Sequence, residues 1–325
     1  MSTPFLTKPA DGIVRLPEMG GMAESVHVID DVSIAALNAA LATRRPLLVR
    51  GEPGTGKSQL ARAAACLLGR AFLPHAVDAR TETRDLLWTL DAVKRLATAQ
   101  LMSALREVDE TKVLARVEAL EFITPGPIWW AFDWNAAETQ AKRVRTSIPA
   151  KPADWTVEKG AVVLVDEIDK ADASVPNGLL DALGHGRFDV EGRDPVVMKN
   201  RRPLIVMTTN EERAMPDAFL RRCLVLHLEV PKDKAALLEF VSVRGRAHFS
   251  QQACSDAVLQ KAAEQLWTDR EEHKRRDLSP PGLAEYIDLL QALTEQRPGD
   301  EMGQLELLEQ IKQFMFGKHP SESLR

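Results

Sequence analysis

The octapeptide Gly51–Ser58, with the sequence Gly-Glu-Pro-Gly-Thr-Gly-Lys-Ser, constrains the fold of this chain more than any other feature. It follows a short apolar run and precedes a stretch that predicts a helix to about Leu68. Glycines let backbone N–H groups surround phosphate oxygens, and the start of the helix adds its positive dipole end. In this context a glycine-rich turn with a surface lysine is the weaker alternative. We therefore predict a loop that binds a nucleoside triphosphate through Gly51, Glu52, Pro53, Gly54, Thr55, Gly56, Lys57, Ser58 and Gln59.

Two adjacent carboxylates are predicted to complete the chemistry at this loop. The apolar run Ala161–Val165 ends in Asp166 and Glu167. Asp166 is predicted to hold Mg²⁺ together with the Ser58 hydroxyl, while Lys57 reaches the β- and γ-phosphates. Glu167 would polarise the attacking water. Two acids that only cap a turn are the weaker alternative beside a phosphate loop, so the predicted cofactors are ATP and Mg²⁺.

Three further polar residues are candidates for sensing or assisting hydrolysis. Asn210 follows the apolar run 204–207 and could hydrogen-bond the γ-phosphate and the lytic water, although asparagine is also a common turn former. Arg221 and Arg222 precede the last apolar run. An arginine from a neighbouring subunit can stabilise charge in the transition state, and we favour Arg222 for this role. The alternative is a pair of cations that suits the C-terminus of a short helix.

Short apolar runs without polar alternation recur along the chain, separated by segments with helical periodicity. Such runs are typical of strands buried on both faces of a parallel sheet. They are Leu47–Val49, Phe72–Val77, Ala161–Val165, Leu204–Met207 and Cys223–Val230. We therefore predict an α/β fold, a P-loop NTPase three-layer sandwich with a five-stranded parallel sheet, followed by a small helical lid domain.

The chain divides into three predicted parts. Residues 1–25, rich in Pro, Gly and Met, would form a flexible N-terminal arm. Residues 26–230 would form the large α/β ATPase domain, with insertions near 84–155 and 184–202, the second of which has the pattern of a hairpin. Residues 231–325 show only helical periodicity and would form the lid domain.

Composition narrows the classes of function. The formal net charge of -5 argues against electrostatic, sequence-independent binding of nucleic acid. The three cysteines lie far apart in apolar stretches and predict buried thiols. No apolar run approaches the roughly 18 residues of a membrane helix, and the N-terminus lacks a signal-like apolar region, so we expect a cytoplasmic protein that does not enter a membrane. The aromatic cluster Trp129–Trp134 predicts packing against the sheet, with a partner-binding surface as the alternative.

Together these residues resemble the AAA+ ATPases, and within them the MoxR-like branch, over about residues 29–292. The resemblance rests on Pro46–Ser58, Asp85–Trp88, Gly126–Ile128, Val165–Lys170, Asn210–Arg213 and Pro216–Arg222. It implies a homo-oligomer, a hexameric ring in which ATP lies between the large domain of one subunit and Arg222 of the next. It also implies a helical insertion near 84–120, a hairpin near 187–198, and chaperone-like remodelling of a protein partner, which for relatives often contains a von Willebrand A domain.

One departure from the family concerns the lid, which in AAA+ proteins usually supplies a basic residue to the phosphates. The corresponding stretch, Leu278–Gly282, contains no arginine. Lys274, Arg275 and Arg276 lie just upstream and either substitute for it or form a solvated charge run. This departure keeps open an ATP-gated assembly scaffold with little turnover, in a defence or signalling system. A nucleic-acid-stimulated motor is a further alternative that the acidic balance disfavours, and a GTPase is disfavoured because the chain lacks an NKxD motif.

Overall fold

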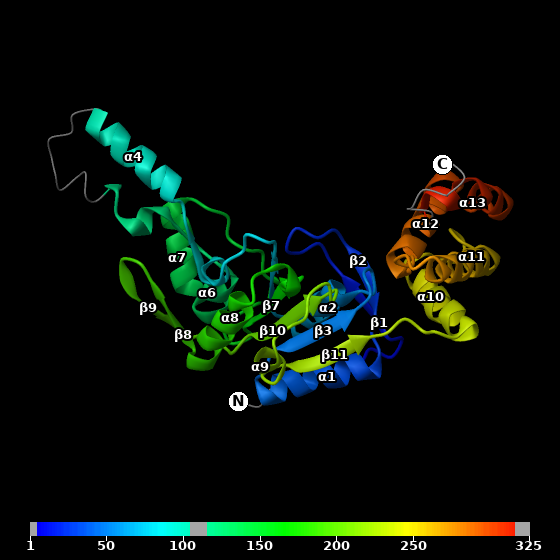
Figure 1. Ribbon diagram of the computed structural model, residues 1–325, viewed down its shortest axis with the longest axis horizontal. Coiled ribbons are helices and arrows are strands. Elements are labelled where there is room, and N and C mark those ends of the chain that lie inside the picture. The colour runs from blue at the N-terminus through cyan, green and yellow to red at the C-terminus, as the bar shows by residue number, and fades with distance from the viewer. Residues whose placement is uncertain (1–4, 105–115, 316–325) are drawn as a thin grey trace.

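A five-stranded parallel sheet forms the centre of the protein in the computed structural model, which describes residues 5–104 and 116–315 (Figure 1). The spatial order of the strands is β11 (Leu224–Leu228), β3 (Leu47–Gly51), β10 (Leu204–Thr209), β7 (Ala161–Asp166) and β4 (Ala71–Ala76). All four neighbouring pairs run parallel. These are the five strands that the sequence predicts, with ends that differ by a residue or two.

Helices cover both faces of the sheet because successive side chains of a buried strand point to opposite faces. Val162 and Leu164 of β7 pack on one side, and Val163 and Val165 pack on the other. The first side is covered by α1 (Asp31–Thr43) and α2 (Lys57–Leu68). The second side is covered by α6 (Pro127–Phe132), α7 (Trp134–Val144) and α8 (Ser174–His185). The three-layer α/β fold is therefore confirmed.

The aromatic cluster belongs to this second side. Trp129 and Trp130 of α6 are buried in the same hydrophobic cluster as β7 and β10. Trp134 at the start of α7 packs edge-to-face on Trp130, with ring centroids 5.0 Å apart. The core-packing interpretation of these residues is therefore confirmed over a partner-binding surface.

The segment expected to be a flexible N-terminal arm, residues 1–25, contains regular secondary structure in the part that the structure describes, residues 5–25. Strands β1 (Ile13–Leu16) and β2 (Ser25–Val28) pair antiparallel. The guanidinium of Arg62 on α2 is fully buried and needs acceptors from outside its own helix. This hairpin supplies them, because Arg62 donates to the carbonyl oxygens of Leu16 and Ala23 at 3.2 and 2.6 Å.

The first insertion builds a small unit at one end of the molecule. Its elements are α3 (Thr83–Leu87), β5 (Trp88–Leu90), α4 (Ala92–Ala104), a 3₁₀ turn (Ala119–Phe122) and β6 (Ile123–Pro125). Strands β5 and β6 pair antiparallel, and α4 projects away from the core (Figure 1). The expected helical insertion near 84–120 is thus present in its described residues, while 105–115 lie outside them. The second insertion forms the predicted hairpin, β8 (Arg187–Val190) and β9 (Arg193–Val197).

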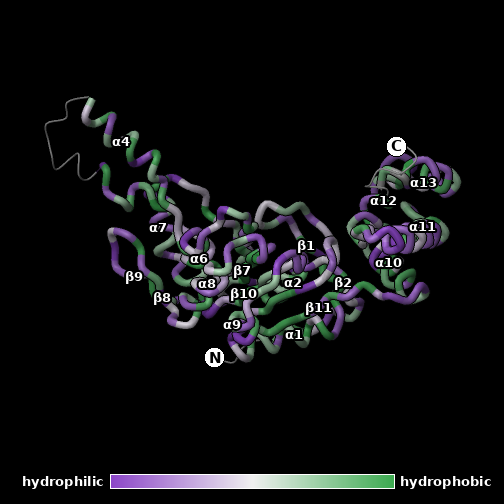
Figure 2. The backbone as a smooth tube through the Cα atoms, in the orientation of Figure 1, coloured by the Kyte–Doolittle hydropathy of each residue, from purple (hydrophilic) through white to green (hydrophobic). Residues whose placement is uncertain are grey.

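The chain after β11 is helical, and it packs around an apolar cluster of its own. The helices are α10 (Lys234–His248), α11 (Asp256–Arg275), α12 (Leu283–Gln296) and α13 (Glu301–Met315). Figure 2 shows hydrophobic residues concentrated in the central strands, and Figure 1 places the four helices beside the core on the side away from α4. Residues 316–325 of the predicted lid lie outside the described residues.

Candidate active site

The predicted phosphate loop connects the end of β3 to the start of α2. Gly54 and Gly56 adopt φ angles of 75° and 92°, a region that residues with a side chain rarely enter. The loop is braced from within, because the Thr55 hydroxyl donates to the carbonyl oxygen of Glu52 at 2.9 Å. Gln59 belongs to α2, and its side-chain oxygen accepts from Ser25 of β2 at 3.4 Å. The side chain of Gln59 therefore faces the N-terminal hairpin.

Lys57 places a cation inside the loop. Its Nζ donates to the carbonyl oxygens of Gly51 and Glu52 at 2.8 and 3.0 Å. Burial lowers the pKa of Lys57, and the nearby carboxylates of Asp166 and Asp169 act in the opposite direction. The ammonium group is thus held by weak, neutral acceptors that phosphate oxygens can replace.

Asp166, at the carboxyl end of β7, faces the loop across the site. Both of its carboxylate oxygens accept from the Ser58 hydroxyl, at 2.8 and 2.9 Å. The hydroxyl of Thr208 on β10 also donates to Asp166. A hydroxyl and a carboxylate are oxygen ligands of the kind that Mg²⁺ takes together with phosphate and water. The described residues contain no cluster of three or more His, Cys, Asp or Glu that would form an all-protein metal site.

Glu167 is held by residues from two neighbouring elements. Its backbone has φ 58° and ψ 49°, a left-handed conformation that is strained for a residue with a side chain. The backbone N–H of Glu167 donates to the Thr208 hydroxyl at 2.9 Å. The two carboxylate oxygens accept from Asn210 Nδ2 at 3.0 Å and from Lys170 Nζ at 2.5 Å. The structure therefore brings Glu167 and Asn210 into direct contact, as the adjacency of β7 and β10 predicts.

Arg221 and Arg222 lie at the other end of the sheet. They follow α9 (Asp217–Leu220) and precede β11, whereas the phosphate loop follows the far end of the adjacent strand β3. Arg45 holds this turn, because its guanidinium donates to the carbonyl oxygens of Arg221 and Arg222, the latter at 3.2 Å. Both arginine side chains are exposed. The structure does not bring them to the phosphate loop of their own chain.

Arg270 is the site residue that the sequence analysis missed. It lies on α11, is only 4% exposed, and its Nη2 contacts Glu52 Oε2 at 3.0 Å and Oε1 at 3.2 Å. Its Nη1 donates to the carbonyl oxygen of Pro281 at 2.6 Å. Arg270 thereby links the phosphate loop to the C-terminal helices. Its helical spacing was an available signal, because Val258, Ala262, Leu266 and Arg270 recur every four residues on one buried face.

The downstream cations do not take this position. Lys274 pairs with Glu271 at 2.9 Å, and Arg276 pairs with Glu272 at 2.6 Å, so both side chains are engaged along α11. The interpretation of this stretch as a solvated charge run therefore fits its geometry.

The start of α12 lies directly against the phosphate loop. A Cβ atom added at Gly54 would lie 2.8 Å from the Cβ of Ala284. A cavity of about 210 Å³ opens beside Thr55, lined by Asp30 of the N-terminal segment, Leu228 of β11 and Phe240 of α10. Three parts of the chain therefore surround the loop.

The sequence matches a known protein family. A family model described as AAA domain, dynein-related subfamily, matches residues 46–223, which is more than half of the chain. Similar solved structures include a candidate ATPase from Cytophaga hutchinsonii ATCC 33406, with 13% identity, TM-score 0.38, and 88% and 80% of the two chains covered. A RuvB variant from Thermotoga maritima shares 15% identity, with TM-score 0.45 and 86% and 68% covered. No curated protein matches the chain. Among the described helices, none combines the length and apolarity needed to cross a bilayer.

Proposed function

The chain belongs to the AAA domain family, dynein-related subfamily, and from this premise we propose that it works as a ring of subunits that hydrolyses ATP to remodel a protein partner. The family makes the protein an ATP-binding ATPase, and AAA+ proteins typically act as oligomers. The hexameric size of the ring, the partner and the role of each residue are part of the proposal. The observation that carries it is the contact of Glu167 with Asn210 at 3.0 Å, directly beside the Ser58–Asp166 pair.

The phosphate loop supports binding of the triphosphate through its backbone N–H groups and Lys57. On binding, Lys57 would exchange two carbonyl acceptors for phosphate oxygens, a stronger charge-assisted interaction. Ser58 and Asp166 would hold Mg²⁺, which supplies charge neutralisation for the β- and γ-phosphates when bound. Their direct hydrogen bond would then open to admit the ion.

Glu167 would accept a proton from the attacking water while its carboxylate is oriented by Asn210. The hydrogen bond from Asn210 supports a second role, because an amide shared between Glu167 and a γ-phosphate would report whether that phosphate is present. Lys170 donates to the other carboxylate oxygen of Glu167. The hydrogen bond to Glu167 is the main cause that raises the pKa of Lys170, so Lys170 stays positive at neutral pH.

Substitution Glu167→Gln tests this assignment. We expect ATP binding to persist within a few-fold while steady-state turnover falls by at least about 100-fold, because the general base is lost and the shape is kept. Binding is measured by calorimetry with Mg²⁺–ATP, and turnover is measured by phosphate release. The matched control is Glu239→Gln on the exposed surface of α10, which should leave both quantities unchanged. Turnover close to wild type in Glu167→Gln would remove Glu167 from this role.

Remodelling of a protein partner is supported by the surface of α4. Val93, Leu96 and Leu101 on this projecting helix are 80%, 60% and 56% exposed, which is uncommon for a group of apolar side chains. Capture of a bound partner by the ATP-loaded Glu167→Gln protein, and its loss when these three residues become Ser, would support the proposal. A von Willebrand A protein is one candidate for that partner.

A second candidate function is an ATP-gated scaffold with little turnover. The ion pair between Arg270 and Glu52 favours it. In this contact the guanidinium of Arg270 is bound to Glu52 and to the Pro281 carbonyl, and not to a phosphate. Steady-state turnover of the purified protein, with and without the captured partner, separates the two candidates. Turnover that DNA or RNA stimulates would instead favour the motor.

A further inference from the structure

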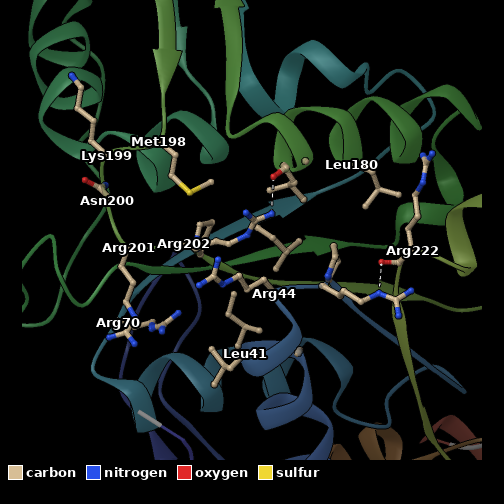
Figure 3. Close-up of a pocket in the computed structure, with 18 of the residues that line it drawn as sticks. Leu41, Arg44, Arg70, Leu180, Met198, Lys199, Asn200, Arg201, Arg202 and Arg222 are labelled. Carbon is tan, nitrogen blue, oxygen red and sulfur yellow. Dashed lines mark hydrogen bonds between the residues drawn. The ribbon is translucent and has the colours of Figure 1, made fainter. Parts of the chain in front are cut away.

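A cavity of about 680 Å³ lies at the end of the sheet opposite the phosphate loop. It is lined by the segments that precede β3, β4, β7, β10 and β11, by the first residues of β10 and by α8. Figure 3 shows arginine side chains converging on it from these separate segments. Its basic lining residues are Arg44, Arg45, Arg70, Lys199, Arg201, Arg202 and Arg222. Glu158 is the single carboxylate among the described lining residues.

Some of these cations already have partners. Lys199 pairs with Asp133 at 2.7 Å, Arg202 donates to the Leu183 carbonyl at 2.7 Å, and Arg45 holds the turn before β11. Within residues 5–104 and 116–315, no carboxylate forms an ion pair with Arg44, Arg70 or Arg201. Three guanidinium groups thus face one cavity without an ion-pair partner among the described residues, and Glu158 is the one carboxylate in its lining.

Arg70 is the most informative of the three. It is only 2% exposed, and its Nη1 is buried without a hydrogen-bond partner. Arg70 and Arg201 lie side by side in Figure 3. Burial and the charge of Arg201 lower the pKa of Arg70 to about 10, so it remains charged at neutral pH. A buried, charged and unpaired guanidinium is costly unless an anion compensates it.

The chemistry of the lining indicates the class of anion. Guanidinium groups match the oxygens of phosphate in paired hydrogen bonds, and several of them around one space favour more than one phosphate group. Leu41, Leu180 and Met198 add apolar walls to the same cavity. The volume is typical of a small-molecule site. A peptide of acidic residues alone would pair with the charges but would leave the apolar walls without a contact.

We propose that the cavity at the amino ends of the strands binds a small organic anion that carries two or more phosphate groups on an apolar or aromatic body. Arg70, Arg201 and Arg44 contact the phosphates, and the apolar walls contact the body. The site lies apart from the phosphate loop of its own chain, at the opposite end of the sheet.

Calorimetry on the Lys57→Ala protein tests the proposal, because this variant weakens phosphate binding at the loop while it leaves the cavity intact. The probes are inorganic tripolyphosphate, ADP and a short polyglutamate peptide. We expect tripolyphosphate to bind and ADP to bind more tightly. If no probe binds to the Lys57→Ala protein, the arginines contact only nucleotide that is bound at a phosphate loop. This result would overturn the proposal. Tighter binding of the peptide, or equal binding of tripolyphosphate and ADP, would also overturn it.

Arginine variants in the same Lys57→Ala background locate the site. Arg201→Met should weaken binding of ADP at least tenfold through loss of one charged hydrogen-bonding group. Arg44→Met, at an exposed position, gives a second readout that does not depend on tolerance of a change near buried Arg70. Arg80→Met, at an exposed arginine outside the cavity, is the matched control and should leave the affinity unchanged. If Arg201→Met and Arg44→Met bind ADP as tightly as the Arg80→Met control, the proposal is overturned.

Discussion

Among the residues of the phosphate loop, Glu52 is the one whose side chain is engaged by the C-terminal helices. Its carboxylate is half-exposed, whereas its partner Arg270 is buried. The two ends of this ion pair therefore differ in what their removal leaves behind. Without Arg270 the carboxylate turns to solvent, but without Glu52 the buried guanidinium keeps only the carbonyl of Pro281 as a described acceptor.

This asymmetry predicts different losses of stability for the two single substitutions. Glu52→Ala should lower the free energy of unfolding by about 1–3 kcal/mol, and Arg270→Met should lower it by less, because Met keeps the packing and removes the buried charge. The thermal midpoint of the nucleotide-free protein measures both. The double variant should be no less stable than Glu52→Ala alone. An equal loss from each single substitution would contradict the asymmetry.

The positions of most residues of the candidate active site could be predicted from the sequence because these residues follow apolar runs. Lys57, Ser58, Asp166, Glu167 and Asn210 follow strands that meet at one edge of a parallel sheet, so adjacency in the sheet fixes their proximity. The contact between Arg270 and Glu52 could not be predicted in the same way. It joins residues 218 positions apart and depends on how the C-terminal helices dock on the loop.

At the scale of elements, the strands of the central sheet were predictable because short uninterrupted apolar runs are typical of strands buried on both faces. The N-terminal hairpin was not, because β1 and β2 have four residues each and lie in a stretch of Pro, Gly and Met that resembles a loop. The hairpin is held by a tertiary contact, because the buried guanidinium of Arg62 donates to carbonyl oxygens of this segment. No local sequence pattern in residues 1–25 predicts this contact with Arg62.

The C-terminal helices pack closely at Gly245 of α10. A Cβ there would lie 2.8 Å from Leu259 Cδ2 and 3.0 Å from both Leu290 Cδ1 and the Tyr286 hydroxyl. Substitution Gly245→Val should therefore overpack this contact and lower the free energy of unfolding by about 1–3 kcal/mol. Urea unfolding followed by circular dichroism measures the loss.

Another helical glycine offers the matched control for that substitution. Gly184 of α8 has no neighbouring atom within 4 Å of an added Cβ. Gly184→Val should change stability by less than about 0.5 kcal/mol, because valine has a somewhat better helix propensity than glycine and meets open space. Equal effects at the two glycines would show that backbone propensity, and not packing, decides both.

At the scale of the whole molecule, the two arginines before β11 and the phosphate loop lie at opposite ends of the sheet. A site that needs both must therefore be shared between two subunits. In the proposed ring, Arg222 of one subunit would serve the nucleotide of the next. The exposure of Arg222 and the support of its backbone by Arg45 fit that role.

Mixing of two inactive variants tests the shared site. Lys57→Ala and Arg222→Ala should each lose nearly all ATPase activity. An equal mixture should recover activity, because roughly a quarter of randomly formed interfaces then combine an intact loop with an intact arginine. Phosphate release after mixing measures this, with light scattering as the control for co-assembly. Co-assembled mixtures that stay inactive would contradict a shared site.

The buried guanidinium of Arg62 also has a consequence for fragments of this protein that lack the N-terminal hairpin. The family match begins at residue 46, yet the carbonyl groups that satisfy Arg62 come from residues 16–23. A fragment trimmed to the matched region would strand a positive charge in an apolar interior and uncover the side of the sheet that α1 shields. The region that matches the family is therefore shorter than the region that we expect to fold by itself. Truncated proteins should keep the N-terminal hairpin.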